Sequence, residues 1–216
     1  MIITAISDTH GTQNKLDLTK YPADVLVHAG DWTARDSKTE IINFLQWFSL
    51  QDYKHLILIA GNHEKFIEFN QSWFNGIITT FPNITYLQDS EITIDGIKFY
   101  GSPYSNMFFN WAFMEEENEL QHIWDKIPDD TNVLITHGPA YGCNDRINNA
   151  YGRDPHVGSK SLTKRKLSLQ GTLKAHISGH IHQSYGVRNT GGCTNVCAAV
   201  LNENYKLVNS PITLEV

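Results

Sequence analysis

The stretch that decides the fold is Lys54-His55-Leu56-Ile57-Leu58-Ile59-Ala60-Gly61-Asn62-His63-Glu64, an apolar run followed by a polar turn. Residues 54–59 have the length and the branched side chains of a strand, and we predict that this strand ends at Gly61. Open α/β sheets place ligand sites at such strand ends. Alone, an Asn-His pair after a glycine is more often a turn with an incidental histidine. Partners elsewhere in the chain must therefore decide its role.

Four other apolar runs end in the same kind of polar group. We predict strands over about 2–7, 24–29, 132–136 and 175–178, and the first lacks the alternation of a half-exposed strand, as is typical of strands covered on both faces. The polar residues that follow these four runs are Asp8 and His10, Asp31, His137, and His180 with His182. Five strand ends thus carry acid, amide or imidazole groups.

Helices are predicted between these strands. Ser37 and Glu40 form a capping-box pattern before apolar residues at helical spacing over 41–48, and further helices are predicted over 159–169 and, on the surface, over 115–126. Alternating strands and helices indicate an α/β fold. Asp95-Gly96 between two short apolar segments predicts a hairpin over 91–100. The last strands are predicted near 194–200 and 212–216, and residues 1–216 are predicted to form a single domain.

Composition excludes some classes of function. The 216 residues carry a net charge of −6, which argues against an extended groove for nucleic acid, and the basic run 164–166 is predicted to be a solvated helix face. No apolar run approaches the roughly 20 residues that span a bilayer, and we expect no signal peptide before the first strand. Three cysteines, Cys143, Cys193 and Cys197, fit reduced thiols, with the last two buried. We therefore expect a cytoplasmic protein.

The polar groups at the five strand ends suit a metal site. Carboxylates, an amide and several imidazoles make a mixed oxygen and nitrogen ligand set that suits manganese, iron or zinc and suits calcium poorly. A site built from this many groups could hold two metals. It is far less probable that five strands end in such groups by accident than that these groups form a functional site.

These motifs, in this order, resemble a known family. Asp8-x-His10, Gly30-Asp31, Gly61-Asn62-His63-Glu64, His137 and Gly179-His180-x-His182 look like the signature of the calcineurin-like binuclear metallophosphoesterases. The chain is also similar in sequence to one branch of this family, the metallophosphoesterase-domain-containing (brain and fetal-brain protein-like) branch. The similar segments are residues 28–31, 59–64, 86–91, 100–103, 134–139 and 179–186. The resemblance runs from the first predicted strand to the last.

The resemblance implies a fold and a set of roles. The fold would be a four-layer αββα sandwich of two mixed β-sheets flanked by helices, with two metals at the strand ends. Asp31 would bridge the two metals, and His63, free of metal, would protonate the leaving oxygen. The first metal would be held by Asp8, His10 and His182, and the second by Asn62, His137 and His180. The role of Glu64 stays open.

The implied activity is hydrolysis of small phosphodiesters, cyclic or other nucleotides included, by in-line attack of a metal-activated hydroxide. Manganese is the expected metal, with iron or zinc as alternatives. A phosphomonoesterase, or a non-catalytic nucleotide-binding regulator on the same fold, is the alternative function. Protein phosphatases of the superfamily carry an Asp-Arg-Gly segment that residues 31–36 lack, so that class is set aside.

Two loops could contact a substrate. The aromatic run 107–113 is either a loop packed over the core or an apolar wall for a substrate ring, formed by Phe108, Phe109 and Trp111. The loop 141–158 offers His156, for which substrate contact and solvent are equal alternatives, and two arginines that are more often solvated, Arg146 and Arg153. The remaining histidines, His28, His55, His122 and His176, are expected to be structural or exposed.

Overall fold

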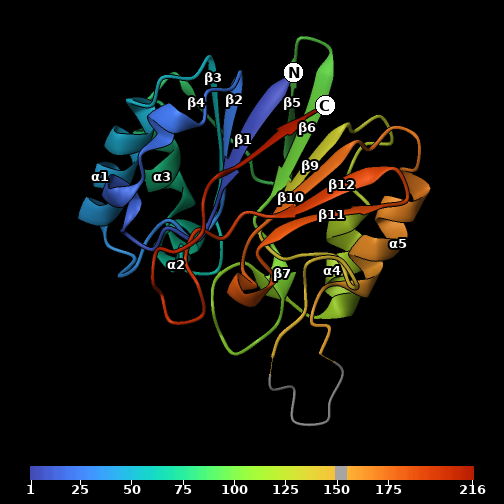
Figure 1. The fold of residues 1–216 in the computed structure, drawn as a ribbon. Coiled ribbons are helices and arrows are strands. Elements are labelled where there is room, and N and C mark those ends of the chain that lie inside the picture. The colour runs from blue at the N-terminus through green and yellow to red at the C-terminus, as the bar shows by residue number, and fades with distance from the viewer. Residues whose placement is uncertain (149–154) are drawn as a thin grey trace.

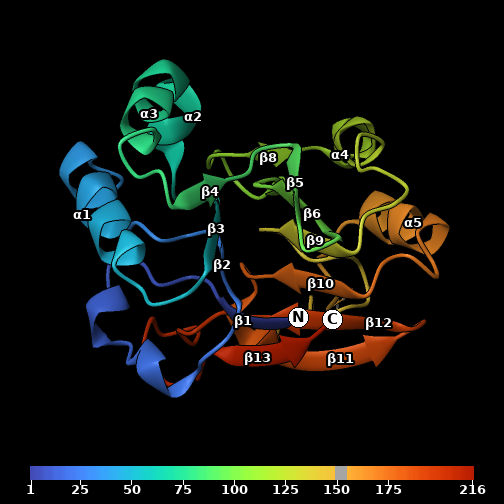
Figure 2. The same cartoon turned by 90° about the horizontal axis from the view of Figure 1, so that it is seen from above.

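The computed structural model describes residues 1–148 and 155–216. Two large mixed β-sheets lie against each other, and helices cover the outer face of each sheet (Figure 1). Seen from above, the four layers follow one another from the helices on one side to the helices on the other (Figure 2). The predicted αββα sandwich is therefore confirmed.

The first sheet has the strand order β13-β1-β2-β3-β4. Strands β1 to β4 run parallel, and β13 pairs antiparallel with β1 at the edge. The strands are β1 (Ile2–Ile6), β2 (Val25–Ala29), β3 (His55–Ile59), β4 (Ile84–Tyr86) and β13 (Ile212–Glu215).

The second sheet has the order β11-β12-β10-β9-β6-β5. Its four inner strands are parallel, and both edge strands are antiparallel to their neighbours. Asp95 and Gly96 form the predicted turn between β5 and β6 with φ values of 48° and 79°. The strands are β5 (Ser90–Ile94), β6 (Ile97–Ser102), β9 (Val133–Thr136), β10 (Ala175–Ser178), β11 (Gly186–Thr190) and β12 (Cys193–Cys197), and a small separate pair is β7 (Ser105–Asn106) with β8 (Met114–Glu115).

Three helices lie beside the first sheet and two beside the second (Figure 1). They are α1 (Lys38–Ser49), α2 (Lys65–Phe69) and α3 (Gln71–Ile78), then α4 (Glu117–Trp124) and α5 (Lys160–Ser168), with short 3-10 turns η1 (Gln13–Lys15), η2 (Leu18–Lys20) and η3 (His182–Ser184). Ser37 caps α1 as predicted, because its side chain accepts a hydrogen bond of 3.2 Å from the Glu40 N–H. The sequence prediction had missed α2 and α3.

Alternate residues of each inner strand face two different apolar layers. In β2, Val25 and Val27 pack between the sheets, whereas Leu26 packs under the helices beside the first sheet. A third cluster fills the space between the second sheet and α4 and α5. Both faces of a strand are therefore buried, and this explains why the strands carry no polar alternation.

The basic run at 164–166 differs from the prediction. Only Lys164 is exposed, whereas Arg165 pairs with Asp129 at 2.7 Å and the Lys166 ammonium lies 2.9 Å from His176 Nδ1. The prediction of a solvated face was wrong for Lys166, because α5 turns that residue toward the sheet. Cys193 and Cys197 are buried as predicted, and both thiols are free.

Within the described ranges, no helix has both the length and the apolar character needed to cross a bilayer.

Candidate metal centre

The polar residues that follow five strands meet at one end of the sandwich. The loops after β1, β2 and β3 come from the first sheet, and those after β9 and β10 come from the second. Each of the two sheets runs these strands parallel, so their carboxyl ends share an edge. The structure brings together all eight residues that the sequence placed in the site: Asp8, His10, Asp31, Asn62, His63, His137, His180 and His182.

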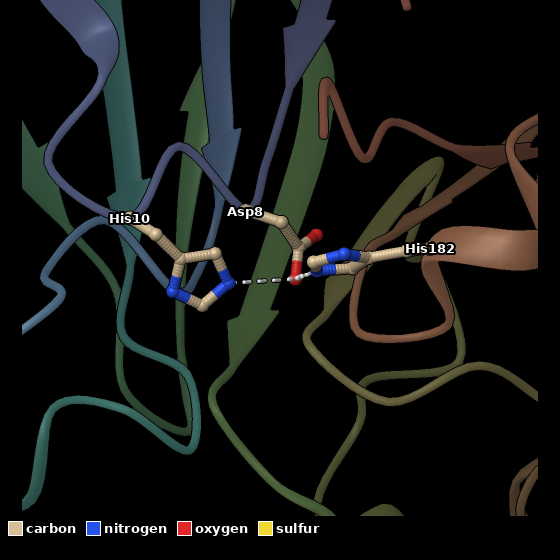
Figure 3. Close-up of side chains that lie close together, drawn as sticks. All are labelled: Asp8, His10 and His182. Atoms are coloured by element: carbon tan, nitrogen blue, oxygen red, sulfur yellow. Dashed lines mark hydrogen bonds and ion pairs between the residues drawn. The ribbon is translucent and has the colours of Figure 1, made fainter. Parts of the chain in front are cut away.

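Three groups of possible ligand atoms form within this set. Ligand atoms of Asp8, His10 and His182 lie within 4.8 Å of one another, and so do those of Asp31, His137 and His180. A third group, His10, Asp31 and His63, shares a residue with each of the first two. In the first group the carboxylate of Asp8 lies between the two imidazoles, 3.2 Å from His182 Nε2 and 4.0 Å from His10 Nε2 (Figure 3).

Asp31 lies between the first two of these groups. Its Oδ2 lies 3.7 Å from His10 Nε2, and its Oδ1 lies 3.3 Å from His137 Nε2. One carboxylate is thus placed to give an oxygen to each of two cations. Asn62 adds a further oxygen, since its Oδ1 lies 2.9 Å from His137 Nε2.

The backbone fixes the tautomer of three of these histidines. A carbonyl oxygen only accepts, so each Nδ1 carries a proton, and in the neutral imidazole each Nε2 has the lone pair that could bind a metal. The donating pairs are His10 to Thr33 O at 3.2 Å, His137 to Ala29 O at 2.9 Å and His182 to Asn202 O at 2.9 Å. His10 Nε2 is buried and has no hydrogen-bond partner among the described residues. A metal ion would satisfy that lone pair, and the residues therefore fit a metal site.

The charges of the site are strongly coupled. Burial opposes ionisation of Asp8, yet its hydrogen bond with His182 and the attraction between them hold the pKa of Asp8 below its usual range. Burial likewise disfavours charge on His137, but Asp31 outweighs it and raises the pKa of His137 to about 9. The same attraction would act on a divalent cation that replaced the proton at Nε2.

Four of the candidate ligands have a strained backbone. Asp8, His10, Asp31 and His180 have φ values of 54°, 39°, 56° and 66°, in the left-handed region that non-glycine residues rarely adopt. Each such residue costs of order 1 kcal/mol, and such strain clusters at functional sites.

Two motif glycines are required by close approach. A Cβ on Gly61 would lie 2.7 Å from both the Asp31 backbone nitrogen and His137 Cε1, and it would overlap Asp31 Oδ1. A Cβ on Gly179 would likewise overlap the carboxylate of Asp8. Each glycine leaves the space that a ligand side chain from another strand occupies.

Glu64 has a role that sequence reasoning could not state. Its carboxylate is fully buried and accepts five hydrogen bonds from the turns after β2 and β3. Oε2 accepts from the N–H groups of Asp31 (3.1 Å) and Gly61 (2.7 Å), and Oε1 accepts from those of Trp32 (3.0 Å) and Thr33 (2.9 Å) and from Thr33 Oγ1 (2.9 Å). Burial and the charge of Asp31 raise the pKa of Glu64, and these bonds oppose the rise. Glu64 therefore holds the two turns in register.

The aromatic run 107–113 packs partly in the core and partly as an exposed wall, so that both predicted arrangements occur in it. Phe113 and Ala112 pack in the core, whereas Phe108, Phe109 and Trp111 are 64%, 74% and 44% exposed. These three line a cavity of about 190 Å³ together with His10, Asp31, Asn62, His63, His180 and His182. The His63 ring packs against the Trp111 ring, with centroids 4.7 Å apart. The exposed aromatic side chains thus form a wall beside the candidate ligands.

Tyr205 also lines the site, and no motif around it predicted this position. Its ring lies 5.1 Å from the ring of His10 and 5.3 Å from that of His182, and it lines the same cavity.

Other predicted residues lie elsewhere. His156 Nδ1 is 2.7 Å from Asp145 Oδ1, and its contact with substrate stays a prediction. Arg146 is exposed, and Arg153 lies outside the described residues. His28 is fully buried, with Nε2 3.0 Å from Thr9 Oγ1, and His176 is buried in the same way, so both are structural as expected.

Comparisons with known proteins agree with this site. Residues 1–184 match the model of the family described as calcineurin-like phosphoesterase. The human metallophosphoesterase domain-containing protein 1 is 33% identical over 97% of this chain and 69% of its own length. A UPF0046 protein of Caenorhabditis elegans is 33% identical over 97% of this chain and 73% of its own. The solved structure of TT1561 from Thermus thermophilus superposes with a TM-score of 0.62 over 91% of this chain and 88% of its own, at 13% identity, which shows the fold alone.

The chain belongs to the calcineurin-like phosphoesterase family, in the metallophosphoesterase-domain-containing branch. Together with the clustered His and Asp side chains, this membership supports a metal-dependent phosphoesterase with a site suited to two divalent cations.

Proposed function

We propose that this protein is a binuclear metal-dependent phosphodiesterase that hydrolyses small phosphodiesters, cyclic or other nucleotides included. The observation that carries the proposal is the placement of Asp31, whose two oxygens face two separate groups of ligand atoms. A carboxylate shared in this way is what a pair of cations requires.

The ligands divide between two positions. Asp8, His10 and His182 would hold one cation, and Asp31 would contact both. The second cation would be held by Asn62, His137 and His180. Cations so held would act as Lewis acids on the phosphoryl oxygens and lower the pKa of a water molecule. The mixed nitrogen and oxygen set suits manganese, with iron or zinc as alternatives.

The charge of the cavity favours a diester over a monoester. Within the described part of the chain, no lysine or arginine lines the cavity that contains the candidate ligands. A phosphomonoester near neutral pH carries about one more negative charge than a diester, and the described lining offers no lysine or arginine to balance it. The neutral amide of Asn62 supplies an oxygen without adding negative charge to the site. The exposed rings of Phe108, Phe109 and Trp111 offer faces on which a nucleobase could stack.

In this proposal His63 protonates the leaving oxygen. Its imidazole lines the cavity with 15% of the side chain exposed, and its Nε2 lies 3.9 Å from Asp31 Oδ2, beyond hydrogen-bond distance. Its backbone N–H donates to Asp31 Oδ1 at 2.9 Å, which fixes the residue beside the bridging carboxylate. Histidine is the side chain that most often serves as a general acid in enzymes.

Replacing His63 by Ala tests this proposal. For diesters with alkyl leaving groups we expect kcat to fall by about 10² to 10⁴-fold, the usual contribution of a general acid. For 4-nitrophenyl leaving groups, which need little protonation, we expect a fall of less than about 10-fold. Elemental analysis should still find two metal ions per chain. The matched control is His122→Ala, which removes an exposed imidazole from α4.

Loss of metal in His63→Ala, or an equal fall for all leaving groups, would refute the assigned role of His63. A manganese-loaded protein that hydrolyses 4-nitrophenyl phosphate faster than bis(4-nitrophenyl) phosphate would instead indicate a monoesterase.

A further inference from the structure

A second, larger cavity adjoins the metal centre. It has a volume of about 480 Å³, and it shares Phe108 and His180 with the cavity that contains the candidate ligands. Phe108 therefore forms a wall common to both cavities. The remaining apolar walls are Met107, Pro139, Ile147, Val157 and Ile181.

The walls of the second cavity that the structure describes are uncharged. Its described lining contains no lysine, arginine, aspartate or glutamate. The one amide that lines it, Asn106, donates its Nδ2 hydrogen bond to Glu117 Oε2 at 2.7 Å. Desolvating a charged group here would have no compensation, so the walls favour an uncharged and apolar occupant.

The outer wall is held in place by hydrogen bonds. The carboxylate of Asp145, 1% exposed, joins the segments that carry Ile147 and Val157. Its Oδ2 accepts from two backbone N–H groups at 3.0 Å each, and its Oδ1 lies 2.7 Å from His156 Nδ1. The backbone N–H of Ile147 donates to Pro155 O at 2.9 Å, and that of Val157 donates to Asp145 O at 3.1 Å. These bonds give both apolar side chains a fixed position.

The inner wall is equally constrained. The Gly138 N–H donates to Tyr104 O at 3.2 Å, and a Cβ on Gly138 would lie only 2.7 Å from Ser105 Cβ. This close approach fixes the turn that carries Pro139, two residues after His137, at the edge of the ligand set. The second cavity therefore has fixed walls and adjoins the metal centre.

The position of His63 decides which part of a substrate enters this cavity. His63 and Trp111 line the cavity with the candidate ligands and are not among the residues that line the second cavity. In an in-line displacement the leaving oxygen lies opposite the attacking oxygen, and the ester arm that is retained points to the side. If the leaving group lies beside His63, the retained arm points toward His180 and Phe108, and these two residues line the second cavity.

We propose that the second cavity binds the retained ester arm of the substrate, and that this arm is a bulky, uncharged, apolar group. The inference rests on the proposed phosphodiesterase function and narrows its substrate class. Preferred substrates are unsymmetrical diesters, in which the apolar arm stays on the product monoester.

A series of diesters with one leaving group tests the cavity. We would measure kcat/KM of the manganese-loaded protein for 4-nitrophenyl diesters whose retained arm is methyl, butyl, phenyl or naphthyl. Burial of a methylene is worth up to about 4-fold in binding, so we expect at least about a 10-fold rise from methyl to butyl. The larger aryl arms should equal or exceed butyl. A 4-carboxyphenyl arm should be at least about 10-fold worse than phenyl, because its charge would be desolvated.

Two variants complete the experiment. Ile147→Asp places a carboxylate in the cavity, and the advantage of the butyl and naphthyl arms over methyl should be lost. Val187→Asp makes the same change at an exposed valine of β11 outside the cavity, and the full rise along the series should remain. The inference would be overturned, and the proposed function would stand, if kcat/KM of the unmodified protein did not change with the retained arm. The same holds if kcat/KM rose equally along the series in both variants. No hydrolysis of any diester would overturn the proposed function and the inference with it.

Discussion

Replacing Glu64 by Gln tests whether this carboxylate holds the metal centre together. The side chain keeps its shape but offers one acceptor oxygen and one NH₂ group, where the carboxylate offered two acceptors. Oε2 accepts from two donors and Oε1 from three, so either orientation of the amide leaves at least two buried donors facing an NH₂ group. Each unsatisfied buried donor costs about 1–3 kcal/mol, which predicts a loss of about 2–6 kcal/mol in the free energy of unfolding.

The assay is urea unfolding of the metal-depleted protein, followed by titration with manganese. Because two of the five donors are the N–H groups of Asp31 and Gly61, we also expect at least a 10-fold weaker affinity for metal. Glu119→Gln, at an exposed position of α4, is the matched control and should change neither quantity. Surface substitutions usually change the free energy of unfolding by less than about 0.5 kcal/mol. If the free energy of unfolding of Glu64→Gln differs from that of the unmodified protein by no more than this, the role assigned to Glu64 is refuted.

Two further predictions follow from the same geometry. Gly61→Ala should lose at least one metal ion per chain by elemental analysis, since the new Cβ would overlap Asp31 Oδ1; full metal content would contradict the close approach. The pKa of His137 and that of His182 are both raised from 6.5 to about 9, by Asp31 and Asp8 respectively against the effect of burial. Their stabilisation is complete below pH 6.5 and is lost as the pH rises through 9, so the melting temperature of the metal-depleted protein should fall over this window. A melting temperature that rises from pH 6.5 to 9 would contradict the pairing.

Local sequence patterns predicted the main strands and the polar residues that follow them, whereas the four layers were implied by the family resemblance. Strands such as β2 and β3 are continuous apolar runs because both faces are buried, and each ends at a glycine and a polar residue that the site requires. The ligand residues follow these strands directly, so the order of motifs along the chain was enough to place them together. The cap of α1 by Ser37 is likewise a local contact within four residues.

Contacts between distant segments could not be predicted in this way. Glu64 accepts hydrogen bonds from residues 31–33, in a different loop, and no spacing in the sequence encodes that pairing. Tyr205 reaches His10 from the opposite end of the chain. Lys166 belongs to a basic run that was predicted to be solvated, yet its ammonium contacts His176 of β10 and Asn195 of β12. Tertiary packing, not local pattern, decides each of these three positions.

The most direct test of the central claim is a metal titration of activity. Manganese would be added to metal-depleted protein while binding is followed by calorimetry and hydrolysis of bis(4-nitrophenyl) phosphate by absorbance. The arrangement of ligands around Asp31 predicts that two equivalents bind per chain and that hydrolysis reaches its maximum only with the second. Saturation of activity at one equivalent, or binding of two without hydrolysis of this diester or of 2′,3′- and 3′,5′-cyclic nucleotides, would contradict a binuclear phosphodiesterase.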